Sequence, residues 1–417
     1  MLGDWIKAAQ SNGAGDGNMR PATPTPAYVF PQGTYDNGPL IRAPHVRPVL
    51  FVSDPQAPAI LAALYALQFN SYWNEAAAEY GIGSLVIEAP LIVAPPLSAT
   101  VSTKSLGSWV NNYLKAYDWS LDENTLYAVY YPENVTVHRS TDGATGCVDF
   151  AAFHSQFSVA TNGVTKNYGY AVMPRCGQNF SLDEMMISST HEIFEWATDP
   201  FPGFARPGST SYLRLDDAHF AFQLFAGGGE LTDFCPGLSA GSEWVKPDGL
   251  GFKVARHLSN RESAAGRYPC GPGETIPFLV GIPNPTATDT LKHGREVSVP
   301  VVEVPSGASQ ATTEVFIHSD VAMKASSCWD LDVLSHGVVK ESSDSSNIAN
   351  VYSSVDTTAD TGIDVSVDSD CVRPGDLVGL KIRKTKTVSE DTRVVLRMRT
   401  KSGSMWNTWP FIVTVRR

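Results

Sequence analysis

The segment from Ser181 to Pro200 constrains the fold most, because it carries the marks of a complete helix with two distinct faces. Ser181-Leu182-Asp183-Glu184 matches a capping box, and Pro200 marks the end of the helix. One face is polar and comprises Glu184, Ser188, His191, Glu195 and Thr198. The apolar residues available for packing are Leu182, Met186, Ile193, Trp196 and Ala197. The segment therefore predicts a helix that packs into a core and presents a polar stripe.

Three side chains of this helix have the spacing of a metal site. His191 and Glu195 lie four residues apart, so they are stacked on one helix face and could bind one ion. Glu192 directly follows the imidazole and could act on water at that ion as a general base. The zincin pattern H-E-x-x-H has histidine at the fifth position, where this chain has Glu195, and a glutamate oxygen is also a zinc ligand. We therefore predict a site for one catalytic Zn²⁺.

A catalytic zinc needs a third protein ligand, and the acidic loop Gly227–Cys235 offers two candidates. These are Glu230 and Asp233, and Asp233 is slightly favoured because Cys235 would anchor it at short range. Asp199 follows Glu192 by seven residues and could orient His191 from behind. A plain helix stop at Thr198-Asp199-Pro200 explains Asp199 equally well.

Six cysteines, without a C-x-x-C pair, predict disulfides and export from the cytosol. Sequential pairing joins Cys147 to Cys176, Cys235 to Cys270 and Cys328 to Cys371, which keeps each bridge inside one structural unit. We therefore expect a secreted, extracellular protein.

The pattern of the chain divides it into three parts. Residues 1–45 are rich in Gly, Pro, Asn and Thr and predict an extended arm or propeptide remnant. Residues 46–282 alternate strand and helix patterns, which favours a mixed sheet covered by helices. The expected elements are strands at 47–53, 84–93, 125–131 and 168–173, and helices at 57–80 and 105–117.

Residues 283–417 are rich in Val, Ser, Thr and Asp in short alternating runs, which predicts an all-β immunoglobulin-like sandwich. The expected strands are 296–304, 314–318, 362–367, 377–382, 393–399 and 411–415.

Four stretches resemble secreted bacterial proteins related to the plant exordium, or phosphate-induced, proteins. They are Gly146–Ser155, Tyr170–Pro174, His191–Pro200, and Gly229-Glu230 with Asp233 and Cys235; a closing segment runs from Ala255 to Cys270. The resemblance covers roughly residues 45 to 280. It implies a zincin-like α/β (α+β) metallopeptidase architecture with a mixed sheet and an active-site helix. From the predicted zinc mechanism we expect a protein or peptide substrate.

The sequence is also compatible with two other functions. A secreted binding or signalling protein could keep the fold with a structural metal, and Gly237-Leu238-Ser239-Ala240-Gly241 matches the serine-hydrolase elbow with Ser239 as nucleophile. We expect His154 to be a core or sheet residue, but it remains a candidate metal ligand because it lies in the stretch Gly146–Ser155 that carries the family resemblance. Asp216 and Asp217 near His219 predict a helix cap, and a calcium site there lacks a full loop pattern.

Charge and hydropathy exclude two classes of partner. The chain has 31 Lys+Arg against 43 Asp+Glu, and it has no basic block that could follow a phosphate backbone, so we expect no nucleic-acid partner. Its apolar runs are far shorter than the roughly 20 residues that span a bilayer, so we expect no membrane span. The sequence leaves the oligomeric state open.

Overall fold

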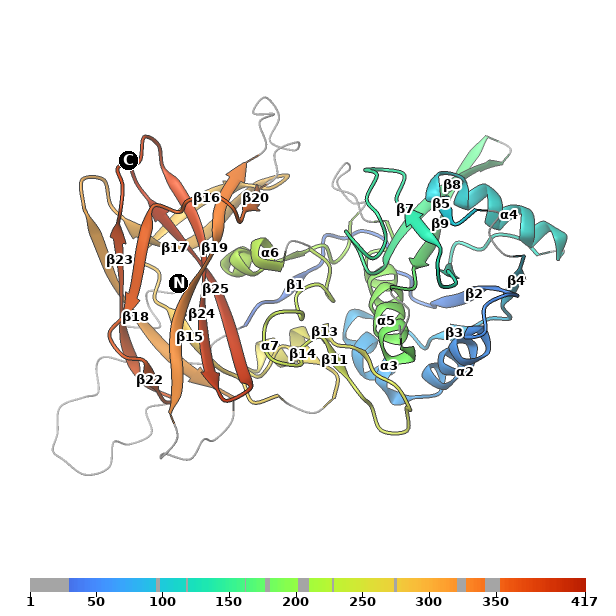
Figure 1. The fold of residues 1–417 in the computed structure, drawn as a ribbon, viewed down its shortest axis with the longest axis horizontal. Coiled ribbons are helices and arrows are strands. Elements are labelled where there is room, and N and C mark those ends of the chain that lie inside the picture. Colours follow the sequence, from blue (N-terminus) through green and yellow to red (C-terminus); the bar gives the residue numbers. More distant parts are fainter. Residues whose placement is uncertain are drawn as a thin grey trace.

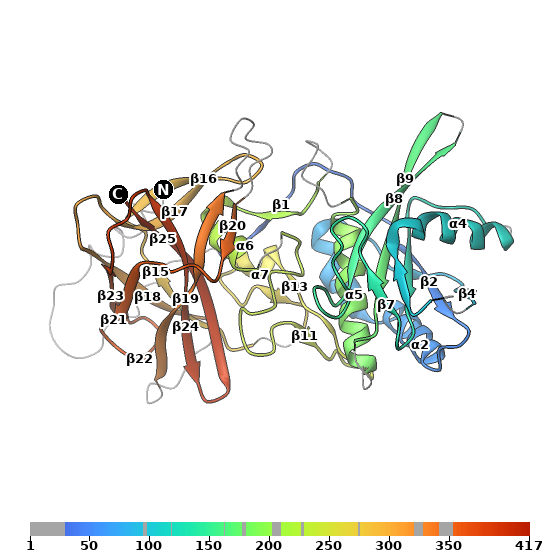
Figure 2. The same cartoon turned by 45° about the horizontal axis from the view of Figure 1, so that its top comes forward.

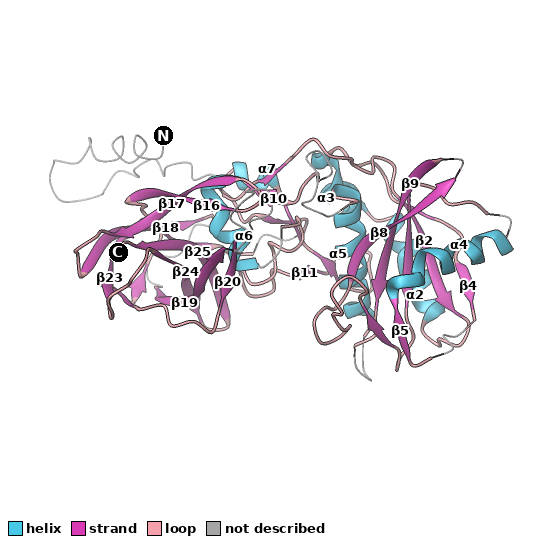
Figure 3. Cartoon of the chain, turned by 90° about the horizontal axis from the view of Figure 1, so that it is seen from above, coloured by secondary structure: helices cyan, strands magenta, loops and turns pink. Residues whose placement is uncertain are grey.

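The chain forms an α/β lobe and a β-sandwich lobe that lie side by side in the computed structural model (Figure 1). The structure describes residues 30–417 apart from nine internal positions or segments. These are 95–97, 118, 162, 177–180, 202–209, 227–228, 274–275, 321–327 and 342–352. Figure 3 shows the helices concentrated in the α/β lobe and the strands in both lobes.

A six-stranded sheet with the order β3-β2-β6-β9-β8 forms the centre of the α/β lobe, and β4 also pairs with β2. Its strands are β2 (His45–Phe51), β3 (Val86–Ile87), β4 (Leu91–Val93), β6 (Thr125–Tyr130), β8 (Phe153–Thr161) and β9 (Val164–Met173). All pairs are parallel except β8 with β9, which form an antiparallel hairpin that extends beyond the rest of the sheet (Figure 2). The sheet is therefore mixed, as the sequence predicted.

Helices cover both faces of this sheet because successive strand residues point to opposite sides. In β6, Leu126, Ala128 and Tyr130 belong to one buried cluster, whereas Tyr127 and Val129 belong to another. The first cluster contains apolar residues of α2 (Ala57–Gln68), α3 (Ser71–Ala77) and α5 (Leu182–Thr198), and the second contains those of α4 (Leu106–Ala116). The lobe thus has three layers, with α5 and α4 on opposite faces.

Two parts of the lobe differ from the sequence prediction. The helix expected at 57–80 is broken at Phe69 and Asn70, because the Asn70 side chain accepts a hydrogen bond from Tyr72 N and starts a new helix. The edge strand β8 was not among the predicted strands.

Smaller elements complete the α/β lobe and the region between the two lobes. The strand pairs are β1 (Gly33–Thr34) with β10 (Arg214–Leu215), β5 (Thr100–Ser102) with β7 (Thr136–His138), β11 (Trp244–Val245) with β12 (Val254–Ala255), and β13 (His257–Leu258) with β14 (Cys270–Gly271). The helices are η1 (Ala78–Tyr80), η2 (Thr103–Ser105), η3 (Asp217–His219), α6 (Phe220–Ala226) and α7 (Asn260–Ala264).

The C-terminal lobe is built from two sheets, in agreement with the all-β expectation. One has the order β15-β18-β23-β21, with strands Leu279–Pro283, Gln310–Ser319, Leu377–Lys384 and Ile363–Val367. The other has the order β16-β17-β25-β24-β19-β20, with β22 also paired to β19. Its strands are Ala287–Lys292, Glu296–Val304, Met405–Val415, Thr392–Ser402, Trp329–Glu341, Ser353–Asp356 and Cys371–Val372. The long strand β19 was not expected from the sequence.

The two lobes are joined by backbone hydrogen bonds and by packed aromatic side chains. Thr408 N in β25 donates to Leu238 O at 2.7 Å, and Ala240 N donates to Trp406 O at 3.0 Å. Phe222 in α6 packs edge-on against Trp409, with ring centroids 4.9 Å apart. The sandwich therefore supports the segments on both sides of the acidic loop.

Residues 30–44 run along this interface, and the rest of the predicted N-terminal arm lies outside the described residues. Phe30 is fully buried against Phe278 and Trp409, and β1 pairs with β10. This part of the chain is an integral, packed element of the fold.

Three disulfides confirm the predicted pairing: Cys147–Cys176, Cys235–Cys270 and Cys328–Cys371. In the described part of the chain, no helix is long and apolar enough to cross a membrane.

Candidate metal centre

Helix α5 forms where the sequence predicted it and is fixed at its N-terminal end and on one side. Ser181 Oγ accepts from Glu184 N and the Glu184 carboxylate accepts from Ser181 N, which completes the capping box. Gly169 in β9 lets the helix approach the sheet closely, because a Cβ there would lie 2.1 Å from Trp196 Nε1. The predicted polar stripe is not a solvated face, since Glu195 and Thr198 are buried.

One cluster joins the helix motif to the acidic loop. His191 Nε2 lies 3.1 Å from Glu195 Oε2 on the next turn of α5 and 3.3 Å from Asp233 Oδ1. The three ligand atoms lie within 4.8 Å of one another. The structure thus brings together three of the residues predicted as ligands, although they come from two separate segments.

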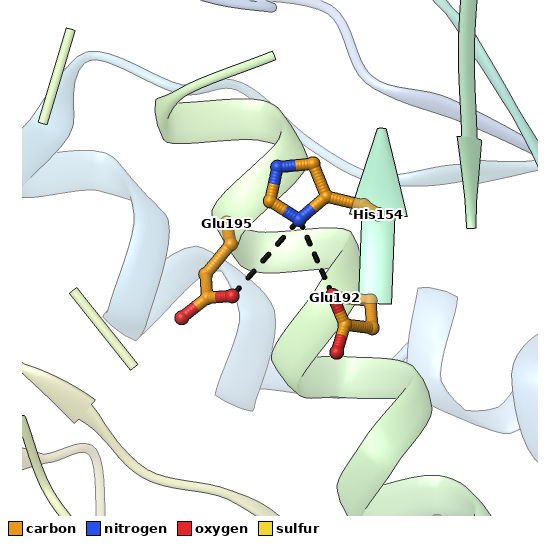
Figure 4. Close-up of side chains that lie close together, drawn as sticks. All are labelled: His154, Glu192 and Glu195. Carbon is orange, nitrogen blue, oxygen red and sulfur yellow. Dashed lines mark hydrogen bonds and ion pairs between the residues drawn. The ribbon is translucent and has the colours of Figure 1, made fainter. Parts of the chain in front are cut away.

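A second cluster shares Glu195 with the first. His154 projects from edge strand β8, and its Nδ1 atom lies 3.2 Å from Glu192 Oε2 and 4.0 Å from Glu195 Oε2 (Figure 4). These three atoms also lie within 4.8 Å of one another. The expectation that His154 is a core or sheet residue describes its burial but misses its contacts with the helix motif.

Glu230 and Asp199 lie on the far side of the His154 ring. His154 Nε2 is 3.2 Å from Glu230 Oε1 and 3.2 Å from the Asp199 carbonyl oxygen. The Asp199 carboxylate accepts from Ser211 N at 2.7 Å, and among the described residues no contact joins it to His191, so the structure does not bring the two together as predicted. The reason is local: Asp199 is the C-cap, with φ −148° and ψ 74°, and so it does not continue the helical periodicity.

The two histidines are held in an acidic environment. Burial lowers the pKa of His154, but the charge of Glu230 and the hydrogen bond to Glu192 outweigh it and raise the pKa well above the usual value. For His191, burial is likewise outweighed by the charge of Glu195 and the hydrogen bond to Asp233, so its pKa is also raised well above the usual value. Without a bound cation, both imidazoles therefore favour the protonated form.

The carboxylates repel one another. Burial raises the pKa of Glu195 well above its usual value, and the charges of Asp233 and Glu230 add to this while His191 opposes it. Burial also raises the pKa of Glu230, with His154 opposing the shift. Among the described residues, Glu195 Oε1 is buried and has no hydrogen-bond partner. An additional cation would relieve both the repulsion and the unpaired oxygen.

Among four side chains of the centre, only those on one side are exposed to solvent. The side chains of His191 and Asp233 are 22% and 32% exposed, whereas those of His154 and Glu195 are 1% and 2% exposed. A molecule in solvent therefore reaches the first cluster from the side of His191 and Asp233. Two surface cavities of about 220 Å³ each lie elsewhere, at α3 and the segment around Pro272.

The other sequence candidates do not form sites. Ser239 is 2% exposed, its hydroxyl donates to Tyr268 Oη at 3.2 Å, and its backbone forms a β-bridge to Asn407 of the sandwich. The elbow pattern is thus part of the interface between the lobes.

The acidic pair near His219 also lacks a common ligand geometry. Asp216 contacts His219 Nδ1 at 2.8 Å, whereas Asp217 pairs with Arg295. These two carboxylates contact different side chains, and nothing in this geometry supports the calcium alternative.

Comparisons with known proteins add little to this geometry. No protein-family model matches the sequence, and no curated protein matches it. Among solved structures, the chain is similar to the ASH/PapD-like domain of human CEP192 (PapD-like domain 7) at 14% identity, with 32% of this chain and 85% of that chain covered and a TM-score of 0.18. We draw nothing about the centre from a likeness of this size.

Proposed function

We propose that the chain is a secreted zinc-dependent peptidase whose metal is held by His191, Glu195 and Asp233. The observation that carries the proposal is the convergence of these three side chains beside Glu192. The proposed relationship to the exordium group and to zincins rests on the motifs of the sequence and on this cluster.

The residues fit zinc in donor type and spacing. Imidazole nitrogen and carboxylate oxygen are ordinary zinc ligands, and tetrahedral bonds of about 2.0–2.2 Å separate neighbouring ligand atoms by about 3.3–3.6 Å. The contacts of 3.1 Å and 3.3 Å around His191 Nε2 are close to that spacing. Three protein ligands with a partly exposed side also match a catalytic site, which keeps one position open, better than a closed structural site.

The chain supplies the groups needed for peptide hydrolysis. When bound, zinc polarises the scissile carbonyl and lowers the pKa of water. Glu192 is the general base: its carboxylate accepts the proton of the attacking water and then donates it to the leaving amine. His154 Nδ1, 3.2 Å from Glu192 Oε2, fixes that carboxylate beside the cluster.

Secretion is supported by the three disulfides, which persist in oxidising compartments. Substrate would approach from the exposed side of His191 and Asp233. We infer a protein or peptide substrate from the resemblance and from the general-base arrangement.

The test compares wild type with Glu192→Gln on a denatured protein substrate, with zinc measured in both. Gln keeps the shape of Glu but cannot accept the proton, so activity should fall by about 10²–10⁴-fold while one zinc stays bound. Zinc without activity in the wild type would favour a binding or signalling protein with a structural metal. Wild-type activity that survives chelation would refute the metal mechanism.

A further inference from the structure

We infer that the chain has a second divalent-cation site, formed by His154, Glu192 and Glu195, which shares Glu195 with the first site. The three residues have ligand atoms within 4.8 Å of one another, and contacts join His154 Nδ1 to Glu192 Oε2 and Glu195 Oε2. Figure 4 shows both carboxylates turned toward the same nitrogen of the His154 ring. A side chain from edge strand β8 thus completes a ligand set on one face of α5.

The far side of the His154 ring is arranged as it is in metal-binding histidines. Such a histidine usually donates its other ring N–H to a carbonyl or carboxylate, which fixes the tautomer and the ring plane. His154 Nε2 lies 3.2 Å from both the Asp199 carbonyl oxygen and Glu230 Oε1. With the Nε2 proton donated on that side, Nδ1 carries the lone pair that would bind a cation placed between it and the oxygens of Glu192 and Glu195.

The carboxylate of Glu195 has a second oxygen that could bind a second ion. Its Oε2 atom faces both His191 and His154, while Oε1 is buried and unpaired among the described residues. The side chain is 2% exposed, so water does not satisfy this oxygen from the surface. A carboxylate that bridges two cations would use both oxygens.

The charge balance of the centre also favours a second cation. Four carboxylates, on Glu192, Glu195, Glu230 and Asp233, form ion pairs with just two imidazoles in this centre. If both imidazoles are neutral ligands, one divalent ion leaves two negative charges in a largely buried site, whereas two divalent ions balance the set.

The second site also predicts regulation, and this step rests on the proposed function. Glu192 is the general base of the proposed mechanism, and a cation bound by its carboxylate would prevent it from accepting a proton. Because its histidine is more deeply buried and its ligand set overlaps the first, we expect the second ion to bind more weakly. Excess zinc should therefore inhibit the peptidase.

The direct test is metal stoichiometry, which does not depend on activity. Metal-free protein is dialysed against increasing zinc chloride, and zinc per chain is measured for wild type, His154→Gln, Glu192→Gln and His45→Gln. His45 is a matched control because its ring also contacts a carboxylate, that of Glu88 at 2.8 Å, but this carboxylate is paired with Arg47 and belongs to neither cluster. Wild type and His45→Gln should reach two zinc ions per chain, and the other two variants should stop at one.

Two further variants make the outcome decisive. His191→Gln should lose the first ion and keep the second, and Glu195→Gln should weaken both. Circular dichroism and thermal unfolding establish that each variant is folded; Glu192→Gln preserves side-chain shape and carries the test if His154→Gln does not fold. Saturation of the wild type at one zinc, or two zinc ions in both His154→Gln and Glu192→Gln, would overturn the inference.

Peptidase activity, measured in the same zinc titration, tests the second site and the proposed function independently. With two zinc ions bound but no peptidase activity at any zinc level, the second site stands and the proposed function fails. With activity and a two-ion stoichiometry, wild-type activity should fall as the second ion binds. Activity that is unchanged at two ions per chain would overturn the regulatory step.

Discussion

Asp233 Oδ1 lies 3.3 Å from His191 Nε2, so the acidic loop meets the histidine of helix α5 directly. Glu230, three residues earlier, instead contacts His154 at 3.2 Å. The structure therefore separates the two candidates for the third ligand: Asp233 faces the first cluster, and Glu230 faces the imidazole of the second.

Asp233→Asn should weaken binding of the first zinc by more than about 100-fold, which exceeds the 10–100-fold typical of partners outside the ligand shell. Glu230→Gln is the matched control, and it should change the affinity of the first zinc by less than about 10-fold because its contact is with His154. Competition with a chromophoric chelator measures both affinities. The assignment fails if Glu230→Gln causes the larger loss.

The Cys235–Cys270 disulfide should be needed for tight metal binding as well as for stability. Cys235 is two residues from Asp233, and its bridge ties the acidic loop to β14. Replacing both cysteines with alanine should destabilise the fold by about 2–5 kcal/mol and also reduce zinc affinity, because the loop gains freedom.

The Cys328–Cys371 pair provides the control for that experiment because it lies within the sandwich. Its double alanine variant should also unfold more easily, but it should keep wild-type zinc affinity under conditions where both variants are folded. Equal losses of affinity in the two variants would show that the effect comes from general destabilisation.

Gly169 should be intolerant of alanine because β9 and α5 touch at this point. The added Cβ would lie 2.1 Å from Trp196 Nε1, and Trp196 is fully buried. Overpacking should lower the free energy of unfolding by about 1–3 kcal/mol. Gly251→Ala, where no neighbouring atom lies within 4 Å, is the control in urea unfolding and should differ little from wild type.

Protonation of His293 at acid pH should weaken the packing between α6 and the sandwich. Burial lowers the pKa of His293 to about 4 from 6.5, and the ring packs edge-on against Phe220 of α6. The folded-state pKa is below the unfolded one, so this stabilisation is complete above pH 6.5 and is lost as the pH falls toward 4.

The loss should reach at most about 3 kcal/mol, from about 1.4 kcal/mol for each pKa unit. Urea unfolding of wild type and His293→Gln between pH 7.5 and pH 4 measures it. Wild type should lose more stability than the variant across this window. Parallel pH profiles for the two proteins would contradict this origin.

Local signals account for the parts of the fold that the sequence predicted. Helix α5 carries its capping box within four residues, and its i, i+4 spacing placed His191 beside Glu195. The sequential cysteine pairing was also correct, because each bridge closes a segment within one lobe. These features depend on residues that are neighbours in the sequence or that lie within one short segment of the chain.

The parts that were missed depend on contacts between distant segments. His154 reaches Glu192 only because β8 pairs with β9 at the sheet edge, and a polar strand such as Phe153–Thr161 has a weak hydrophobic signal. The Asn162-Gly163 pair that follows it is a hairpin signal that could have revealed β8. The position of Asp199 could not be read from helical periodicity, because the backbone leaves the helix at that residue.

The most direct test of the central claim is the zinc content of the purified protein, wild type beside His191→Gln, after dialysis at a zinc concentration that fills only the tighter site. Wild type should hold one zinc ion per chain and His191→Gln essentially none, while both retain the same circular dichroism spectrum. A wild-type protein that binds no zinc near neutral pH, or a folded His191→Gln variant that binds it as tightly as wild type, would contradict the metal centre and the peptidase proposed from it.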